Sequence, residues 1–337
     1  MQNLSHIAAH RRDDVQAAVQ LVFGSRTTEL RPLTGGVSGA QIFRFDVRSR
    51  SFVLRIEPDR IALSDRDRGF RCMEAAATVG AAPSVHFADA VTGIAIMDFV
   101  PGRSLSDHPE GPLGLVRALG GLVAKVQQTP PFPILGALPE TLGDMLARLG
   151  QSGVLGRADL TPHLEAHARI QAALPWDEAS LVSSHNDPNT RNMLFDGQRV
   201  WLIDWELAFR NDRLFDVAIL TTDLADTPEL ESALLEATFA APPNRSLTAR
   251  LSVIRLLTRL FYACIVLDSL GSEAHSGPQA GEPALTPRAF RAAVAEGRLA
   301  SGTPETAYAF AKMSLAAFIN GVAAPNFEET LEMVRQG

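Results

Sequence analysis

Secondary-structure signals are distributed unevenly along this chain of 337 residues. In the first hundred residues, apolar residues recur at helical spacing over 13–23 and 65–79. The rest of that stretch holds short β-prone runs bounded by polar turns, at 29–33, 41–47, 51–56, 84–90 and 94–99. Short turns favour antiparallel neighbours. This part is therefore predicted to form a five-stranded antiparallel sheet with one helix inserted after the third strand.

The segment Val100-Pro-Gly-Arg103 interrupts that pattern, and we interpret residues 97–103 as a hinge. After it the apolar spacing is mostly helical. Helices are predicted over 111–128, 139–150, 160–173, 213–224, 228–240, 246–269, 286–298, 303–319 and 326–336. Short strands are predicted at 181–183, 193–195 and 200–203, and the turn Asp196-Gly197 joins the last two. The expected class is α+β, with an amino-terminal lobe over 1–97 and a mainly helical lobe over 98–337. The segment 271–287, rich in Gly, Ser, Pro and Glu, is expected to be a mobile loop.

Composition excludes several classes of protein. A hydrophobic share of 46% and a charged share of 20% are typical of globular domains, and the formal net charge of −7 argues against binding to nucleic acid. Cys72 and Cys264 show no metal-ligand spacing and are expected to be reduced thiols of a cytoplasmic protein. The start of the chain resembles no signal peptide, and the most apolar stretch, 251–270, carries three charged residues, so no membrane association is expected.

Polar residues recur at a distinctive spacing around residue 190. The segment His185-Asn-Asp-Pro-Asn-Thr-Arg-Asn192 reads His-x-Asp-x-x-x-x-Asn, and Asp204 ends the apolar run 200–203. Phosphoryl transfer from ATP uses one carboxylate to orient a hydroxyl, and an amide and a second carboxylate to hold Mg²⁺. We interpret Asp187 as the catalytic base, and Asn192 and Asp204 as catalytic residues that bind the metal, although an Asp before Pro188 is also typical of a turn.

Three neighbours of this motif receive supporting roles. His185 is expected to brace the loop rather than act as an acid or base. Glu206 lies on the same side of an extended chain as Asp204, where it could assist the metal, contact a cationic substrate or simply be solvated. Asp216, close to a predicted helix start, is expected to brace the catalytic loop through hydrogen bonds.

The amino-terminal lobe contains candidates for binding phosphate. Glycines between the first two strands would let backbone N–H groups approach phosphate oxygens, with a serine hydroxyl to assist, although most such loops are only turns. The residues concerned are Gly35, Gly36, Ser38 and Gly39. Arg55, between apolar neighbours on the third strand, needs an acidic partner, and Glu74 on the following helix is the predicted one. A surface Arg on an edge strand is the alternative.

These motifs together resemble the choline/ethanolamine kinase branch of the aminoglycoside phosphotransferase superfamily. The resemblance rests on the segment 185–192, Ile203-Asp-Trp-Glu206, Thr34-Gly-Gly-Val-Ser-Gly39, Val53-Leu-Arg-Ile56 and Met97-Asp-Phe-Val-Pro-Gly102, and it covers roughly residues 30–225. It implies a two-lobed protein-kinase-like fold, ATP, Mg²⁺ and a small hydroxyl-bearing acceptor. It also implies that the backbone of Asp98 and Val100 binds adenine.

The acceptor is less constrained by the sequence. Choline kinases enclose a quaternary ammonium group with aromatic rings, and the candidates here are Trp205, Phe209, Phe261 and Tyr262, with Glu206 as counter-charge. Core packing is the alternative for Phe261 and Tyr262. The leading hypothesis is an ATP- and Mg²⁺-dependent kinase of a small alcohol, for example an amino alcohol such as choline or ethanolamine. An aminoglycoside phosphotransferase and a non-catalytic kinase-like nucleotide-binding module are the alternatives. A protein kinase is disfavoured because Asp-Trp-Glu replaces Asp-Phe-Gly.

Overall fold

The computed structural model of the chain describes residues 6–24, 29–33, 39–59, 63–152, 157–271 and 283–336. The chain divides into two compact units. The first unit comprises Met1–Ile134, Val182–Asp216 and Asp223–Pro242. The second unit comprises Leu135–Leu181, Val217–Thr222 and Pro243–Gly337. All the residues proposed for transfer, metal binding and phosphate binding belong to the first unit.

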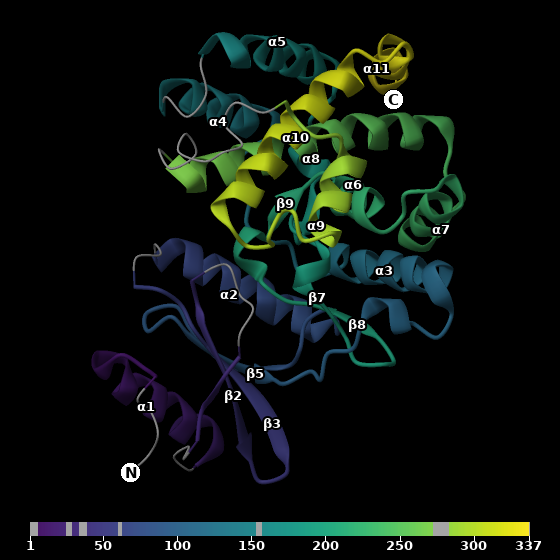
Figure 1. The fold of residues 1–337 in the computed structure, drawn as a ribbon. Coiled ribbons are helices and arrows are strands. Elements are labelled where there is room, and N and C mark those ends of the chain that lie inside the picture. The colour runs from purple at the N-terminus through teal and green to yellow at the C-terminus, as the bar shows by residue number, and fades with distance from the viewer. Residues whose placement is uncertain are drawn as a thin grey trace. The chain divides into compact units, whose positions relative to one another are not determined.

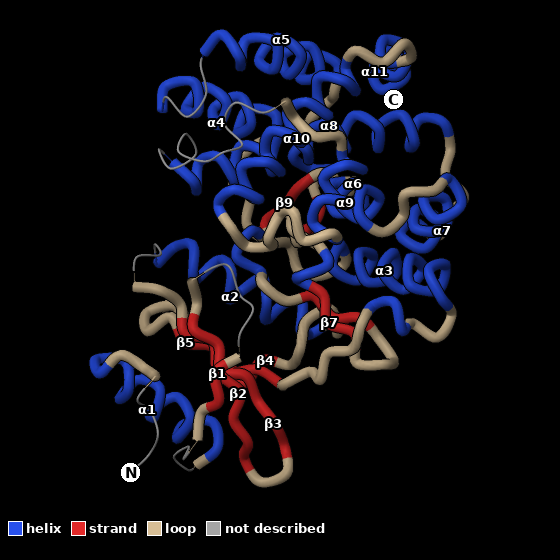
Figure 2. Tube along the Cα trace, in the orientation of Figure 1, coloured by secondary structure: helices blue, strands red, loops and turns tan. Residues whose placement is uncertain are grey.

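The first unit contains the predicted five-stranded antiparallel sheet (Figures 1 and 2). Its spatial order is β1-β2-β3-β5-β4, and its strands are β1 (Arg31–Pro32), β2 (Gln41–Val47), β3 (Arg50–Ile56), β4 (Val85–Asp89) and β5 (Ile94–Asp98). Helix α2 (Leu63–Thr78) is inserted after β3, as expected. Strand β1 is shorter than predicted, since Pro32 has no backbone N–H to donate to the ladder. The sheet and the inserted helix confirm the predicted α+β class.

One face of the sheet is apolar. Phe52, Leu54 and Ile56 of β3 are buried in a core that α1 (Arg12–Phe23) completes through residues such as Val15. Successive side chains of a strand point to opposite faces. Arg55, between Leu54 and Ile56, therefore lies on the face opposite this core. The alternation of β3 is sufficient to place its guanidinium group there.

The remainder of the first unit supports the motif around residue 190. Two small antiparallel sheets pair β6 (Val182–Ser184) with β9 (Phe209–Asn211), and β7 (Met193–Phe195) with β8 (Val200–Leu202). Helices α3 (Gly111–Gln127) and α7 (Pro228–Phe239) pack closely at Gly120, where a Cβ atom would stand only 2.7 Å from Cβ of Ala237. The turn Asp196-Gly197 predicts the hairpin β7–β8. Strand β9 is not predicted, because three residues show no usable alternation.

The second unit is helical in the residues described. Its helices are α4 (Leu138–Ser152), α5 (Arg157–Ala173), α8 (Arg245–Leu270), α9 (Pro287–Ala295), α10 (Pro304–Val322) and α11 (Phe327–Gln336), and it includes most of α6 (Phe215–Asp223). The side chains of Asn244, Thr286 and Thr303 cap α8, α9 and α10 by accepting a backbone N–H. These caps explain why the helices begin within a residue or two of their predicted starts. Residues 272–282 of the segment expected to be a mobile loop lie outside the described residues.

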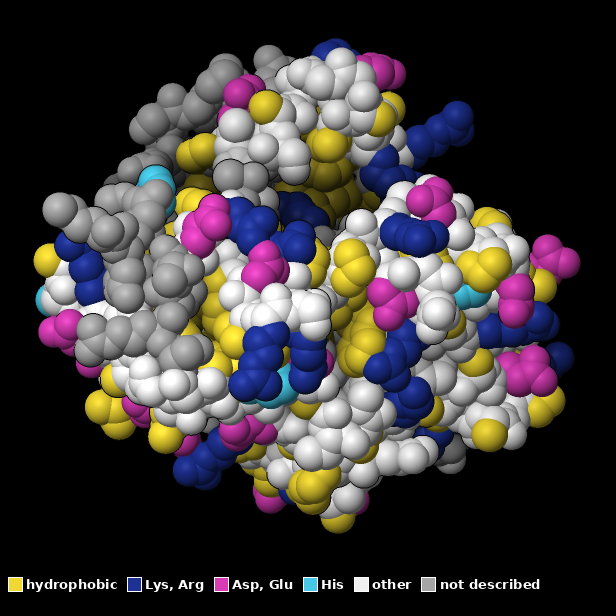
Figure 3. Space-filling view, turned by 90° about the horizontal axis from the view of Figure 1, so that it is seen from below, with side chains coloured by type: hydrophobic (Ala, Val, Ile, Leu, Met, Phe, Trp, Pro, Cys, Tyr) yellow, Lys and Arg dark blue, Asp and Glu magenta, His cyan; other side chains and the backbone are white. Residues whose placement is uncertain are grey.

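Two further features of the structure concern membrane spans and surface charge. Within the described ranges, no single helix is long and apolar enough to cross a membrane, and one bent pair, α10 with α11, passes only by length and composition. On the face of the molecule shown in Figure 3, Lys and Arg side chains are interspersed with Asp and Glu, with hydrophobic side chains scattered among them.

Candidate active site

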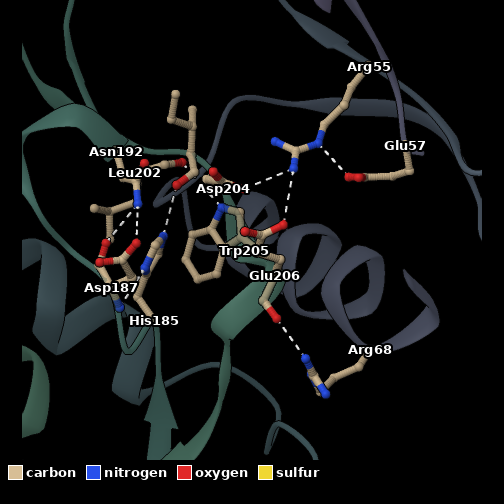
Figure 4. A network of polar contacts seen from close by, with 11 residues as sticks. Arg55, Glu57, Arg68, His185, Asp187, Asn192, Leu202, Asp204, Trp205 and Glu206 are labelled. Carbon is tan, nitrogen blue, oxygen red and sulfur yellow. Dashed lines mark hydrogen bonds and ion pairs between the residues drawn. The ribbon is translucent and has the colours of Figure 1, made fainter. Parts of the chain in front are cut away.

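The loop that follows β6 holds Asp187 in a fixed position (Figure 4). Its Oδ1 accepts a hydrogen bond from Nδ2 of Asn189 at 2.7 Å, and its Oδ2 accepts one from Nδ2 of Asn192 at 2.8 Å. Nδ2 of Asn192 also donates to the backbone oxygen of Asp187 at 3.0 Å. Asn192 is buried, whereas Asp187 is half-buried. The side-chain amides of Asn189 and Asn192, in the same loop, therefore set the orientation of the Asp187 carboxylate.

His185 connects this loop to the end of β8. Its ring is fully buried and packs against the indole of Trp205, with ring centroids 4.5 Å apart. Nδ1 lies 3.3 Å from the backbone nitrogen of Asp187, and Nε2 lies 3.0 Å from the carbonyl oxygen of Ile203. Nδ1 must therefore accept and Nε2 must donate, which is the neutral Nε2–H tautomer. Burial lowers the pKa of His185 from its usual value, in agreement with this tautomer. The bracing role expected for His185 matches this geometry.

Asp216 at the start of α6 secures the same loop from the other side. Its carboxylate accepts the backbone N–H groups of His185 at 2.8 Å and Asn186 at 2.7 Å. Asn186 has a φ of +63°, which the two bonds help to maintain. Complete burial raises the pKa of Asp216 to about 6, and the hydrogen bonds from the backbone oppose that rise. These bonds confirm the structural role predicted for Asp216.

The hairpin β7–β8 sets the distance between the two proposed metal ligands. Asp196 closes its turn by accepting the backbone N–H groups of Gln198 and Arg199, both at 2.8 Å. At the open end, the backbone N–H of Ile203 donates to the carbonyl oxygen of Asn192 at 2.9 Å. Asn192, just before β7, and Asp204, just after β8, are therefore both at the open end of this hairpin. The hairpin spacing in the sequence brings the two residues close together.

Asp204 itself has an unusual backbone conformation. Its φ is +68°, a region that few residues other than Gly adopt. Strained conformations of this kind are concentrated at functional sites, where the surrounding structure holds them. Here Nη2 of Arg55 donates to Oδ1 of Asp204 at 2.9 Å, and the Asp204 side chain is 23% exposed. The carboxylate therefore faces both a cation and solvent.

Arg55 has partners other than the predicted one. Its Nε donates to Oε1 of Glu57 at 2.6 Å, and its Nη2 lies 3.7 Å from Oε2 of Glu206. Glu74 is exposed on α2, and the described ion pairs of Arg55 do not include it. The expected pair of Arg55 with Glu74 is therefore wrong for this structure. Glu57 comes from the same strand end and reaches Nε without crossing to another element.

Glu206 lies at the more open side of this cluster, with its side chain 46% exposed. Loss of solvent raises its pKa to about 7, the Asp204 carboxylate adds to the rise, and Arg55 opposes it. Its backbone oxygen accepts a hydrogen bond from Nη2 of Arg68 on α2 at 2.7 Å. A Cβ atom on Gly69 would stand 3.5 Å from Cα of Glu206, so α2 passes close to this turn. Helix α2 thus fixes the turn that carries Asp204 and Glu206.

The aromatic candidates are placed differently from one another. Trp205 is 3% exposed, packs edge-on against Phe132 and donates from Nε1 to the carbonyl oxygen of Leu202, so its ring is part of the buried packing around the site. Phe209 is buried in β9. Phe261 is buried and Tyr262 half-buried on α8 of the second unit, with their rings 6.0 Å apart. Core packing accounts for the buried rings.

The structure describes only part of the predicted nucleotide site. Gly35, Gly36 and Ser38 lie outside the described residues, and Gly39 has a φ of +75°. Asp98 and Val100 line a pocket of about 400 Å³. The backbone N–H of Asp98 donates to the carbonyl oxygen of Ser84, so adenine could bond to the backbone of this residue only through its carbonyl group.

The donor set suits Mg²⁺, which prefers hard oxygen ligands. Asn192 and Asp204 offer an amide oxygen and a carboxylate, and the amide nitrogen of Asn192 is already bonded to Asp187. Across the described ranges, no group of three or more His, Cys, Asp or Glu residues could hold a metal by itself. A metal bound at Asn192 and Asp204 would therefore need further oxygens from phosphates, as is usual for Mg²⁺ in kinases.

A family model described as the phosphotransferase enzyme family matches residues 29–248. This chain belongs to the phosphotransferase enzyme family. The match includes the loop after β6, the hairpin β7–β8 and the turn at Asp204, and it confirms the resemblance to this family that the sequence motifs indicate. An uncharacterized protein of Metamycoplasma hominis is 34% identical over 76 residues, which is 22% of this chain and 15% of that protein's length.

Several solved structures of this class of enzyme share the fold. A choline/ethanolamine kinase family protein from Mesorhizobium loti aligns with a TM-score of 0.64 and 21% identity, covering 97% of this chain and 100% of that one. Plasmodium vivax ethanolamine kinase gives 0.60 and 12%, covering 90% and 83%. A spectinomycin phosphotransferase crystallised with ADP and spectinomycin gives 0.58 and 10%, covering 90% and 98%. This phosphotransferase thus has the expected two-lobed kinase-like fold.

Proposed function

We propose that this phosphotransferase transfers the γ-phosphoryl group of ATP to a hydroxyl group of a small molecule. The observation that carries the proposal is the hydrogen bond between Asp187 and Asn192, in a loop whose far end pairs with the strand leading to Asp204. It joins a carboxylate suited to an acceptor hydroxyl with the two groups suited to a metal. Family membership and the kinase-like fold support the same chemistry.

In this proposal Asp187 contacts the acceptor. One of its carboxylate oxygens accepts the hydroxyl proton as the oxygen attacks the γ-phosphorus, and the bond from that phosphorus to the bridging oxygen of ADP breaks. The amides of Asn189 and Asn192 hold the carboxylate in one orientation, so the acceptor arrives aligned with the leaving group. His185, fixed as a neutral ring, keeps this loop at its distance from β8.

The remaining charges serve the nucleotide. Bound Mg²⁺, held by Asn192 and Asp204, would neutralise charge on the phosphates. Arg55 presents a planar fork of N–H donors that suits phosphate oxygens. The loop with Gly35, Gly36, Ser38 and Gly39, and the backbone of Asp98 and Val100, complete the proposed ATP site within the lobe 1–97 and the hinge that follows it, and the acceptor is proposed to bind to the lobe 98–337.

The proposed acceptor is an amino alcohol such as choline or ethanolamine. Asp204 and Glu206 lie together, and Glu206 is the more exposed, so its carboxylate is placed to attract a cationic group beside the attacking hydroxyl. The names of the neighbouring choline/ethanolamine kinases support this class. The spectinomycin phosphotransferase supports the aminoglycoside alternative, which also has a cationic acceptor.

The free thiols bear on the proposed location. Cys72 and Cys264 are both unpaired and buried, and burial raises the pKa of each thiol to about 12, which leaves them inert. Such thiols are compatible with the reducing cytoplasm, where we propose that the protein acts on cytoplasmic ATP.

The test is consumption of ATP with Mg²⁺ in the presence of separate acceptors: choline, ethanolamine, other amino alcohols, thiamine, sugars and aminoglycosides. Asp187→Ala, which removes the carboxylate, is the control. Turnover that depends on one acceptor and is lost in Asp187→Ala supports the proposal and names the acceptor. Binding of MgADP without turnover on any acceptor would favour a non-catalytic nucleotide-binding module instead.

A further inference from the structure

We propose that Glu57 is the positioning residue for Arg55, in place of an acidic residue on the inserted helix. This inference rests on the proposed function, since it concerns how Arg55 is presented to nucleotide phosphates. Nε of Arg55 lies 2.6 Å from Oε1 of Glu57, and the two side chains are only 12% and 7% exposed (Figure 4). A buried Arg requires a carboxylate at a fixed distance, because an unpaired buried charge is very costly.

The spacing along β3 explains why this residue can reach Nε. Residues two apart on an extended chain lie on one face, so Arg55 and Glu57 project together from the side opposite the apolar core. Nε is only three carbons from the backbone, whereas the ammonium of a Lys would extend further from the strand. An Arg at this position can therefore be held from its own strand.

Glu57 is itself anchored through its backbone. Its N–H donates to the carbonyl oxygen of Gly93 at 2.8 Å, and its carbonyl oxygen accepts from Nη1 of Arg11 at 3.2 Å. Gly93 has a φ of +63°, and a Cβ atom there would stand 3.2 Å from both Cβ of Glu57 and Nε of Arg66. The backbone of the residue after β3 is thus held by two separate parts of the lobe, the turn at Gly93 and the segment that carries Arg11.

The contacts of the Arg55 guanidinium group show which of its nitrogens are already bonded to carboxylates. Nε is bonded to Glu57, and Nη2 is bonded to Asp204 and close to Glu206. Nη1 takes part in none of these contacts within the described part of the chain. A carboxylate at Nε fixes the plane of the fork, and Nη1 is then left to donate to oxygen ligands such as phosphate.

Helix α2 places a cation beside the turn at Glu206, where a carboxylate is expected near Arg55. It presents Arg68, which donates to the backbone oxygen of Glu206 at 2.7 Å and to Asp65 at 3.0 Å. Glu74 on the same helix is exposed. The acid that pairs with Arg55 thus comes from the end of its own strand, and the helix contributes a cation that contacts the turn at Glu206 instead.

The test measures MgADP binding by calorimetry in the wild type, Glu57→Gln and the matched variant Glu74→Gln. Glu57→Gln keeps the size of the side chain but removes its charge. We expect the Kd of MgADP to rise about tenfold in Glu57→Gln, which is about 1.4 kcal/mol, and to change less than twofold in Glu74→Gln. With the acceptor that supports turnover, KM for ATP should rise in parallel, while KM for the acceptor stays within twofold.

A second comparison separates positioning from a loss of folding. In an Arg55→Ala background, adding Glu57→Gln should weaken MgADP binding no further, because the residue it positions is gone. Glu57→Asp, which restores the charge on a shorter side chain, should recover part of the affinity. A tenfold loss in Glu74→Gln with none in Glu57→Gln, or an equal loss from Glu57→Gln with and without Arg55, would overturn the inference. If the wild type itself fails to bind MgADP, the proposed function falls first.

Discussion

Nδ2 of Asn192 lies 2.8 Å from Oδ2 of Asp187, so one hydrogen bond joins the proposed metal ligand to the proposed base. The bond means that binding of a metal to the amide oxygen of Asn192 also fixes the carboxylate that faces the acceptor. Asn189 contacts the other oxygen of Asp187 and is not a proposed metal ligand. The two amides therefore offer a matched pair of substitutions.

Asn192→Ala should lower kcat by about 10²-fold, because it removes both a metal ligand and a group that orients Asp187. It should also raise the Mg²⁺ concentration required for half-maximal rate. Asn189→Ala should lower kcat by about tenfold at most and leave the Mg²⁺ requirement unchanged. Steady-state rates over a Mg²⁺ titration measure both quantities. Equal Mg²⁺ requirements in the two variants would contradict the ligand role of Asn192.

Gly93→Ala should destabilise the protein more than Gly111→Ala. Both glycines have a φ of +63°, but a Cβ on Gly93 would meet Cζ of Arg66 at 3.1 Å, whereas nothing lies within 4 Å of one on Gly111. The cost of the backbone conformation, about 1 kcal/mol, is shared, and the crowding adds to it only at Gly93. Denaturant unfolding gives the difference. Equal losses of stability would show that Arg66 and Glu57 both shift aside at no cost.

His185 should contribute a loss of stability as the pH falls from about 6.5, the ordinary pKa of His, toward its lowered pKa in the folded state. Asp216 and Glu206, whose pKa values are raised, act in the opposite direction and are present in both proteins compared. Burial lowers the pKa of His185 in the folded state. Between that lowered pKa and the ordinary one, the unfolded chain binds more protons than the folded chain, so the free energy of unfolding rises with pH. His185→Gln, which can still donate to Ile203, should show a shallower dependence. Because burial also lowers the pKa of His163 and His167, the comparison with wild type is what isolates His185. Identical slopes would mean that folding does not lower the pKa of His185.

Glu206→Gln should separate the two roles that the sequence leaves open for this residue. If Glu206 attracts a cationic acceptor, the substitution raises KM for that acceptor by about fivefold, the value of roughly 1 kcal/mol for an exposed ion pair. The Mg²⁺ requirement should remain as in the wild type. The proposed function predicts this outcome. A raised Mg²⁺ requirement with an unchanged acceptor KM would assign Glu206 to the metal instead.

The fold is largely predictable because its signals are local. The alternation in β2 and β3, the short apolar run of β5, the insertion of α2 and the Asp196-Gly197 turn each depend on a few adjacent residues. The five-stranded sheet and the β7–β8 hairpin follow from them. The three residues of β9 carry no such signal, since they become a strand only by pairing with β6. Element starts are predictable where a cap such as Asn244 or Thr303 marks them.

The site is predictable in its motif and not in its ion pairs. The spacing of Asp187, Asn192 and Asp204 is fixed by one loop and one hairpin, both continuous in sequence. The partner of Arg55 depends on which carboxylate lies at the height of Nε, and the resemblance to kinases, which commonly use a helix acid, favours Glu74. The pattern Arg-Ile-Glu at 55–57 is the signal for the observed pair, since it places two opposite charges on one face of the strand end.

Asp187 is proposed to act in phosphoryl transfer and not in nucleotide binding. The most direct measurement follows labelled γ-phosphate from ATP to the acceptor and the Kd of MgADP, in the wild type and Asp187→Asn. We predict that the Kd changes less than twofold, and that transfer by Asp187→Asn is about 10²- to 10⁴-fold slower, the range for loss of a general base. Transfer by Asp187→Asn at the wild-type rate would contradict the account.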